Sequence, residues 1–150
     1  MTRAQCIVHR GRHILMALHR MNGEEWWCLF GGGAGPAETA SQAALSELFE
    51  ECCVTGEIIR QTAAYTYDQG IENVTFLVDI GNQTPQRGND PEFSLEDQIL
   101  TDIGWLDLSE ISERDRAYLW AAGLLCVPPF LEEVSSWGDV MSYPISQTKV

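Results

Sequence analysis

The segment from Gly31 to Val54, GGGAGPAETASQAALSELFEECCV, carries the clearest structural signals of the chain. Its glycines follow a short aromatic run, and from Thr39 onward the residues are helix formers with an apolar stripe at helical spacing. Thr39 followed by Gln42 is a capping-box pattern, which predicts the start of a helix that continues to about Cys53. We therefore expect a strand that ends at the glycines, then a loop, then an amphipathic helix.

One side of this helix is acidic. Successive helical residues turn by roughly 100°, so the spacing of Glu47, Glu50 and Glu51 places them on one face. The small residues Ala40 and Ala43 lie on the same arc and leave room beside the carboxylates. The opposite arc is apolar and is expected to face the core: Leu45, Leu48, Phe49 and Cys52.

The acidic face indicates a cation site next to a phosphate site. Like charges at these spacings destabilise a helix, and no Lys or Arg occurs from Gly31 to Ile59 to offset them. Mg²⁺ takes oxygen ligands and keeps waters and substrate phosphates in its shell, which a one-sided row of carboxylates can supply. The alternative is a solvated acidic face without a ligand. The glycines favour the cation site, because backbone without Cβ atoms can approach phosphate oxygens or a metal.

The spacing of the stretch resembles the Nudix box. That pattern is Gly, five residues, Glu, seven residues, Arg-Glu, an aliphatic residue, any residue, Glu-Glu, any residue, Gly and an aliphatic residue. This chain has the following residues at those places: Gly32, Glu38, Ser46, Glu47, Leu48, Phe49, Glu50, Glu51, Cys52, Cys53 and Val54. A match at so many positions is more specific than a glycine loop alone. In element order, the resemblance to a MutT-like Nudix hydrolase covers about Gln5 to Leu125.

The resemblance implies roles for the residues of the box. The catalytic group would be Glu47, Glu50 and Glu51, which would also ligate the metal together with the Gly32 carbonyl. The backbone that contacts the substrate would be that of Gly31, Gly32 and Gly33. Glu38 would support the loop. The general base is left open between a box Glu and three loop residues: Glu92, Glu96 and Asp97.

Two positions depart from the box. Ser46 stands where the family has Arg, a residue that helps to orient and neutralise a catalytic Glu. Cys53 stands where the family ends the helix with Gly, and a cysteine at positive φ would be strained by roughly 1–2 kcal/mol. Gly56 is an alternative end for the helix.

Outside the box, turn residues separate further strands and helices. The expected strands are Gln5 to His9, His13 to His19, Trp26 to Phe30, Glu57 to Tyr67, Asn73 to Ile80 and Ile99 to Leu106. The other expected helices are Ser112 to Leu125 and Leu131 to Trp137, and Gly81 to Pro91 has the composition of a long surface loop. This order favours an α/β (α+β) fold with a mixed β-sheet sandwiched between helices, as one domain over residues 1–150.

Composition limits the partners. With 22 Asp and Glu against 9 Lys and Arg, the net charge of −13 disfavours binding of a nucleic-acid polymer. No apolar run approaches the roughly 18 residues of a membrane helix, so we expect no membrane contact and a cytoplasmic protein. The 5 cysteines include no CxxC pair, which favours reduced and mostly buried thiols.

Aromatic residues and histidines outside the box are expected to be structural. Trp26, Tyr65 and Tyr67 could stack on a base, but aromatic residues in strands are more often core residues. The histidines are expected near strand ends without a role in the site: His9, His13 and His19.

The sequence thus predicts a hydrolase that depends on Mg²⁺ or Mn²⁺. Its substrate would be a small nucleotide diphosphate compound, in which a nucleoside diphosphate is linked to another moiety. ADP-ribose-like compounds, nucleotide sugars and nucleoside triphosphates all stay open, as does a homodimer. The alternative is a nucleotide-binding module of the same fold that has lost turnover through Ser46.

Overall fold

The computed structural model describes residues 1–88 and 99–138. Its strands are β1 (Thr2–Ile7), β2 (His9–Arg10), β3 (His13–Met21), β4 (Glu24–Cys28), β5 (Phe30–Gly33), β6 (Glu57–Tyr67), β7 (Ile71–Asp79) and β8 (Leu100–Leu106). Its α-helices are α1 (Ala40–Cys52), α2 (Glu113–Ala121) and α3 (Pro128–Ser135). Short 3₁₀ turns are η1 (Asp68–Gly70), η2 (Leu108–Glu110) and η3 (Leu124–Cys126).

The strands form two sheets. The first has the order β5-β1-β7-β6, in which β1 and β7 run parallel and the other neighbours run antiparallel. In the second sheet, β3 pairs antiparallel with β2, β4 and β8. The hairpin predicted from Glu57 to Ile80 is present as β6 and β7, with η1 as its turn.

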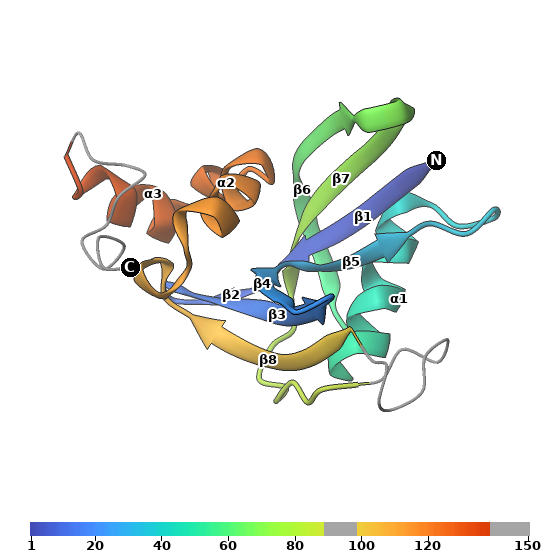
Figure 1. The fold of residues 1–150 in the computed structure, drawn as a ribbon, viewed down its shortest axis with the longest axis horizontal. Helices are drawn as coiled ribbons and strands as arrows, with labels where there is room; N and C mark the ends of the chain where they lie inside the picture. Colours follow the sequence, from blue (N-terminus) through green and yellow to red (C-terminus); the bar gives the residue numbers. More distant parts are fainter. Residues whose placement is uncertain (89–98, 139–150) are drawn as a thin grey trace.

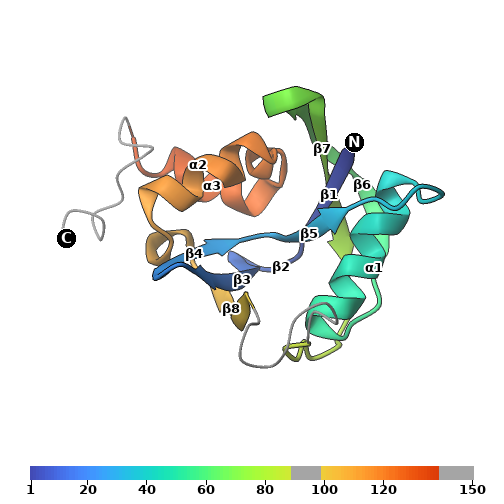
Figure 2. The same cartoon turned by 45° about the vertical axis from the view of Figure 1, so that its right-hand side comes forward.

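Helices cover both faces of the first sheet (Figure 1). Helix α1 lies on one side, and α2 and α3 lie on the other, as a second view also shows (Figure 2). The two faces carry separate cores, because successive side chains of a strand point to opposite faces. In β1, Ala4 and Cys6 belong to the core under α1, whereas Ile7 packs with Leu119 and Phe130. The predicted mixed sheet between helices is confirmed.

The glycines are part of a strand and do not end one. Gly31, Gly32 and Gly33 belong to β5 and pair with β1, so the prediction that the strand stops before them is wrong. A Cβ atom added to Gly31 would lie 2.3 Å from the Ala4 carbonyl oxygen. Glycine is therefore needed for the close approach of the two backbones. The predicted strand from Trp26 to Phe30 is instead divided at Leu29 between the two sheets.

Helix α1 has the predicted length and caps. The Thr39 side chain accepts from the Gln42 amide, and the Gln42 side chain accepts from the Thr39 amide, so the capping box is confirmed. Cys53 is the C-cap at φ 62°, the geometry in which a cysteine is strained. Gly56 is not among the residues with positive φ, so its suggested role as the end of the helix is wrong.

The orientation of α1 was predicted in part. Leu48 and Cys52 are buried and Leu45 packs against the same core, as expected. Phe49 is 57% exposed and Ala43 is fully buried, so both were assigned to the wrong side. The buried arc is centred nearer Ala44 than the apolar residues alone indicate, because small residues let the helix approach the sheet closely.

The last two helices differ from their predicted bounds. Helix α2 ends at Ala121 instead of Leu125, since Gly123 adopts φ 83° and begins a 3₁₀ turn. Helix α3 begins at Pro128 instead of Leu131 because proline is tolerated in the first turn of a helix, where its missing amide is not needed.

All 5 cysteines are free, as expected. Cys6 and Cys52 are buried and Cys28 is partly buried, but Cys53 and Cys126 are exposed, so the prediction of mostly buried thiols holds only in part. In the described part of the chain, no helix is long and apolar enough to cross a membrane.

Candidate active site

Helix α1 and strand β5 lie side by side, and their contact places Glu47 against Gly32. A Cβ atom at Gly32 would lie 2.5 Å from the carboxyl carbon of Glu47 and within 2.8 Å of both its oxygens. Any side chain at position 32 would therefore push the carboxylate away. The glycine of the box is required here by space, since its φ is not in the left-handed region.

Glu51 reaches the same strand one residue earlier. The Gly31 amide donates to Glu51 Oε1 at 3.2 Å. Strand β5 is at the edge of its sheet in the described structure, so amides on its outer side have no strand partner there. Glu51 satisfies one of them, and the Glu47 and Glu51 carboxylates thus meet two successive glycines of β5.

The third carboxylate of the predicted group is placed differently. Glu50 is exposed, and no contact with Gly31, Gly32 or Gly33 is recorded for its side chain. Among residues 1–88 and 99–138, no three or more His, Cys, Asp or Glu side chains are grouped as a metal site would need. The structure therefore brings two of the three glutamates together, and the metal and catalytic roles of all three stay predictions.

The donor chemistry around β5 fits a hard cation. The Glu47 and Glu51 carboxylates are oxygen donors, which Mg²⁺ prefers, and Mg²⁺ usually takes only one or two carboxylates and fills its shell with water and phosphate. The Gly32 carbonyl, which the resemblance implied as a further ligand, faces β1 instead, because Gly32 pairs with Ala4 while the Gly31 amide points away from β1. The negative charge reaches the core: burial raises the pKa of the Cys6 thiol, and Cys52, Glu51 and Glu47 add to the effect. A bound cation would offset this field.

Glu38 and Ser46 fasten the loop before the helix. Glu38 accepts from the Gly35 amide at 2.9 Å and from the Ser46 hydroxyl at 3.0 Å. These two bonds, in that order, lower the pKa of the Glu38 carboxyl. Glu38 thus supports the loop, as the resemblance implied, and the side chain at the position of the family's Arg points to Glu38.

The segment after β7 holds the other end of α1. The amides of Gln86 and Gly88 donate to the Cys52 and Glu51 carbonyls at 2.9 and 2.8 Å, which satisfies two acceptors of the last helical turn. A Cβ atom at Gly88 would lie 2.0 Å from the Glu50 carbonyl oxygen. Sequence reasoning missed this role, because the segment was expected to be a surface loop and only the lone glycine hinted at a close approach.

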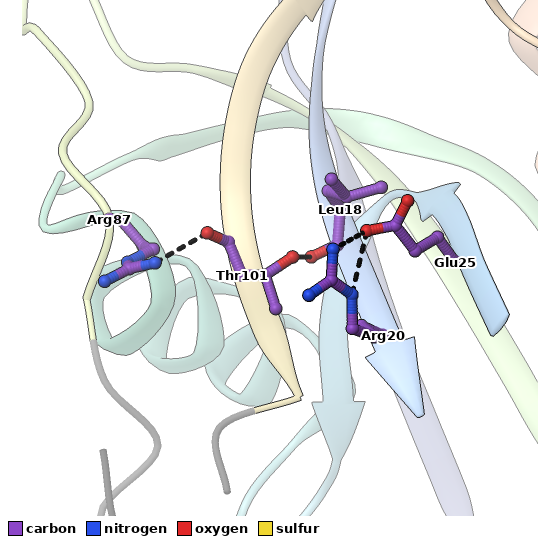
Figure 3. A network of polar contacts seen from close by, with 5 residues as sticks. All are labelled: Leu18, Arg20, Glu25, Arg87 and Thr101. Atoms are coloured by element: carbon purple, nitrogen blue, oxygen red, sulfur yellow. Dashed lines mark hydrogen bonds and ion pairs between the residues drawn. The ribbon is translucent and has the colours of Figure 1, made fainter. Parts of the chain in front are cut away.

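Arg87 ties that segment to the second sheet. Its guanidinium donates to the Thr101 carbonyl oxygen at 2.6 Å, as Figure 3 shows. Arg60 donates to the Cys126 carbonyl oxygen at 2.5 Å, so neither arginine is bonded at the position of the missing box Arg in the described contacts. The candidate bases in the following loop lie outside the described residues: Glu92, Glu96 and Asp97.

An aromatic pocket of about 620 Å³ opens on the sheet face opposite α1 and reaches Gly31. Five of its lining residues are aromatic: Trp26, Trp27, Tyr65, Tyr67 and Tyr118. Trp26, Tyr65 and Tyr67 therefore line a cavity, and the prediction that they are core residues is wrong. Side chains alternate along β6, so Tyr65 and Tyr67 lie on the same face. Strand propensity alone does not tell whether that face is buried or lines a cavity.

His19 also lines the pocket. Burial lowers its pKa, and the charge of Arg3 lowers it further. Its ring lies edge-on to Trp26 with 5.8 Å between centroids. Of the other two histidines, His9 bonds the Gly11 carbonyl in an exposed turn and His13 faces Asp107 at 3.7 Å. A neutral His19 therefore forms part of the aromatic wall.

Helix α2 is joined to the pocket wall by hydrogen bonds from two adjacent charged residues. Asp115 is buried and accepts from the Trp27 amide at 3.0 Å and from Arg114 Nε at 3.1 Å. Arg114 also donates to the Glu25 carbonyl oxygen. These contacts join α2 to β4, so the pocket wall is built from elements that lie far apart in the sequence.

The chain belongs to the Nudix family. The family model for the NUDIX domain matches residues 1–126, which confirms the expectation drawn from the box. Comparison with curated proteins finds no match.

Solved structures with the same fold include several hydrolases. A NUDIX hydrolase from Nitrosomonas europaea has 15% identity and a TM-score of 0.65, with 88% of each chain covered. A C. elegans Ap4A hydrolase has 18% identity and a TM-score of 0.63, with 87% of this chain and 98% of that chain covered. An ADP-ribose pyrophosphatase from Streptococcus suis has 16% identity and a TM-score of 0.56, with 71% of this chain and 73% of that chain covered. These TM-scores show a shared fold.

Proposed function

We propose that this protein is a Mg²⁺- or Mn²⁺-dependent hydrolase that cleaves the diphosphate linkage of a nucleoside diphosphate joined to another group. One observation carries the proposal: the carboxylates of Glu47 and Glu51 meet the glycines of β5, and the aromatic pocket reaches Gly31 from the opposite face of the sheet. A base in the pocket and a diphosphate along β5 would then belong to one molecule. The solved hydrolases that share the fold act, by their names, on Ap4A and on ADP-ribose, both of which contain such a linkage.

The chain's own residues would divide the work. Glu47 and Glu51 would hold the cation, with Glu50 as a further ligand through water. The cation would neutralise charge that develops on the phosphate oxygens and activate a water for attack on one phosphorus. The glycines of β5 leave the diphosphate room to approach the strand edge, and the paired Glu38 and Ser46 keep the adjoining loop in place.

A screen for Mg²⁺-dependent turnover tests the proposal. ADP-ribose, diadenosine tetraphosphate, nucleotide sugars and nucleoside triphosphates would each be incubated with the protein, and nucleotide products separated by chromatography. We expect turnover of at least one class and a loss of about 10²-fold or more in kcat for Glu51→Gln. Glu57→Gln is the matched control, since Glu57 is an exposed carboxylate on the far edge strand β6.

The same screen distinguishes the hydrolase from the nucleotide-binding module. Binding of nucleotides without turnover by the parent protein would favour the binding module and reject the hydrolase. Turnover that Glu51→Gln leaves unchanged would reject the assignment of the site.

A further inference from the structure

Arg3 is the one arginine of the chain for which the described structure gives no hydrogen bond or ion pair. The others donate to carbonyl oxygens or pair with carboxylates: Arg10 with Gly81 and Gln83, Arg12 with Glu132, Arg20 with Glu25, Arg60 with Cys126, Arg87 with Thr101, Arg114 with Asp115, and Arg116 with Leu108. Figure 3 shows two of these engaged side chains, Arg20 and Arg87. In a chain with net charge −13, Arg3 is thus set apart by having neither a carbonyl nor a carboxylate partner among the described contacts.

The side chain of Arg3 lies in the aromatic pocket. In β1, Ala4 and Cys6 face the core under α1, whereas Arg3 and Gln5 line the pocket on the other face. Arg3 is opposite Gly33 in β5, and Gln5 is opposite Gly31. No side chain of β5 therefore stands between Arg3 and the edge of the sheet, where the Glu51 carboxylate accepts from Gly31.

The neighbours of Arg3 leave its charge uncompensated. His19 is kept neutral, because burial and the Arg3 charge both lower its pKa. Burial, together with Glu51 and Asp115, raises the pKa of the Cys28 thiol to about 12, so this thiol carries no charge at neutral pH. Of the lining carboxylates, Asp115 is held by Arg114, and Glu24 is exposed. The pocket thus presents one available cation among aromatic rings.

We propose that Arg3 binds the phosphoryl group that stays with the nucleoside half of the substrate. This inference rests on the proposed function. The aromatic walls would take the base, Arg3 the adjacent phosphate, and the carboxylates across β5 the phosphate that is attacked. The pocket is then a site for a nucleoside 5′-monophosphate unit, and the nucleoside monophosphate product binds it and competes with substrate.

Binding without metal tests this inference independently of turnover. Adenosine 5′-monophosphate and adenosine would be titrated into the protein in the presence of EDTA, with the emission of the lining residues Trp26 and Trp27 as signal. We expect the monophosphate to bind about tenfold tighter or more, because an Arg-phosphate contact is charge-assisted and bidentate. Guanosine 5′-monophosphate and guanosine would be titrated in the same way.

Variants assign the preference to one residue. In Arg3→Gln, the monophosphate should bind at most about twofold tighter than the nucleoside. In Arg3→Lys, this ratio of affinities should lie between those of Arg3→Gln and the parent, because lysine keeps the charge but not the planar fork. Arg12→Gln changes the net charge equally outside the pocket, where Arg12 pairs with Glu132, and should keep the preference.

Several outcomes would overturn the proposal: no preference in the parent protein, a preference that survives Arg3→Gln, or one that is lost in Arg114→Gln instead. Failure here is distinct from failure of the proposed function. A protein that hydrolyses no diphosphate but shows the Arg3-dependent preference loses only the hydrolase assignment. A hydrolase without that preference loses only the role of Arg3.

Discussion

Cys53 ends helix α1 at φ 62°, a conformation that glycine adopts without cost and cysteine does not. Replacing Cys53 by Gly should therefore stabilise the fold by about 1 kcal/mol, although the greater freedom of glycine in the unfolded chain offsets part of the gain. Urea unfolding measures the change. Cys126→Gly is the matched control, because Cys126 is also exposed but lies at negative φ, and this variant should lose about 0.5–1 kcal/mol. Equal effects of the two substitutions would reject the strain argument.

Ser46 bonds Glu38 through a single hydroxyl, where the family has the fork of an arginine. Ser46→Arg should raise kcat more than it changes KM, because a guanidinium between Glu38 and the carboxylates of α1 fixes their orientation where charge develops. Arg60 and Arg87 donate elsewhere and do not duplicate this role in the described contacts. Steady-state kinetics on the substrate from the turnover screen decides the matter, with Ser41→Arg on the same helix as control. An unchanged kcat would mean that Ser46 is no defect.

The two sides of helix α1 should respond differently to truncation. Leu48 is fully buried, whereas Phe49 is 57% exposed. Leu48→Ala should cost about 2–5 kcal/mol, and Phe49→Ala less than about 1 kcal/mol, although Phe is the larger side chain. Chemical denaturation of both variants gives the comparison. A larger loss for Phe49→Ala would show that the helix is rotated relative to the sheet.

The sequence predicted those elements whose signals are local. The capping box at Thr39, the helix end at Cys53 and the β6–β7 hairpin each depend on neighbouring residues, and each is present. The pairing of the glycines with β1 could not be predicted, because it depends on the Ala4 carbonyl from a distant strand. The rotation of α1 likewise depends on how closely the sheet lets its alanines approach.

The arrangement of the candidate site could likewise be predicted only where its signals are local. Glu47 and Glu51 were chosen from their spacing within one helix, and in the structure both carboxylates contact the glycines of β5. The pocket residues Arg3, His19 and Tyr65 come from three separate strands, so no local pattern connects them. The contact of Gly88 with the C-terminal turn of α1 could not be predicted for the same reason.

For the molecule as a whole, the surplus of negative charge predicts that bound cations stabilise the fold. The net charge is −13, and under the proposed function the substrate phosphates would add further charge beside the carboxylates of α1. Mn²⁺ alone should bind weakly, because the Glu47 and Glu51 carboxylates leave most of its coordination shell to water. Phosphate oxygens would fill those positions, so metal and nucleotide should bind cooperatively and each should tighten the other by the same factor.

Thermal unfolding and calorimetry measure this coupling. With Mn²⁺ or a methylene-bridged nucleoside diphosphate alone at about 100 times its Kd, the protein should gain roughly 2.7 kcal/mol, or about 5–11 °C in Tm, and with both ligands together it should gain more than the sum of the two separate gains. Glu51→Gln should lose this gain while its metal-free Tm stays within about 4 °C of the parent, since a Gln oxygen can still accept from the Gly31 amide. Glu57→Gln, with the same loss of charge away from β5, should keep the full gain. Additive shifts in the parent protein, or equal coupling in Glu51→Gln, would show that the cation binds elsewhere than at the carboxylates of α1.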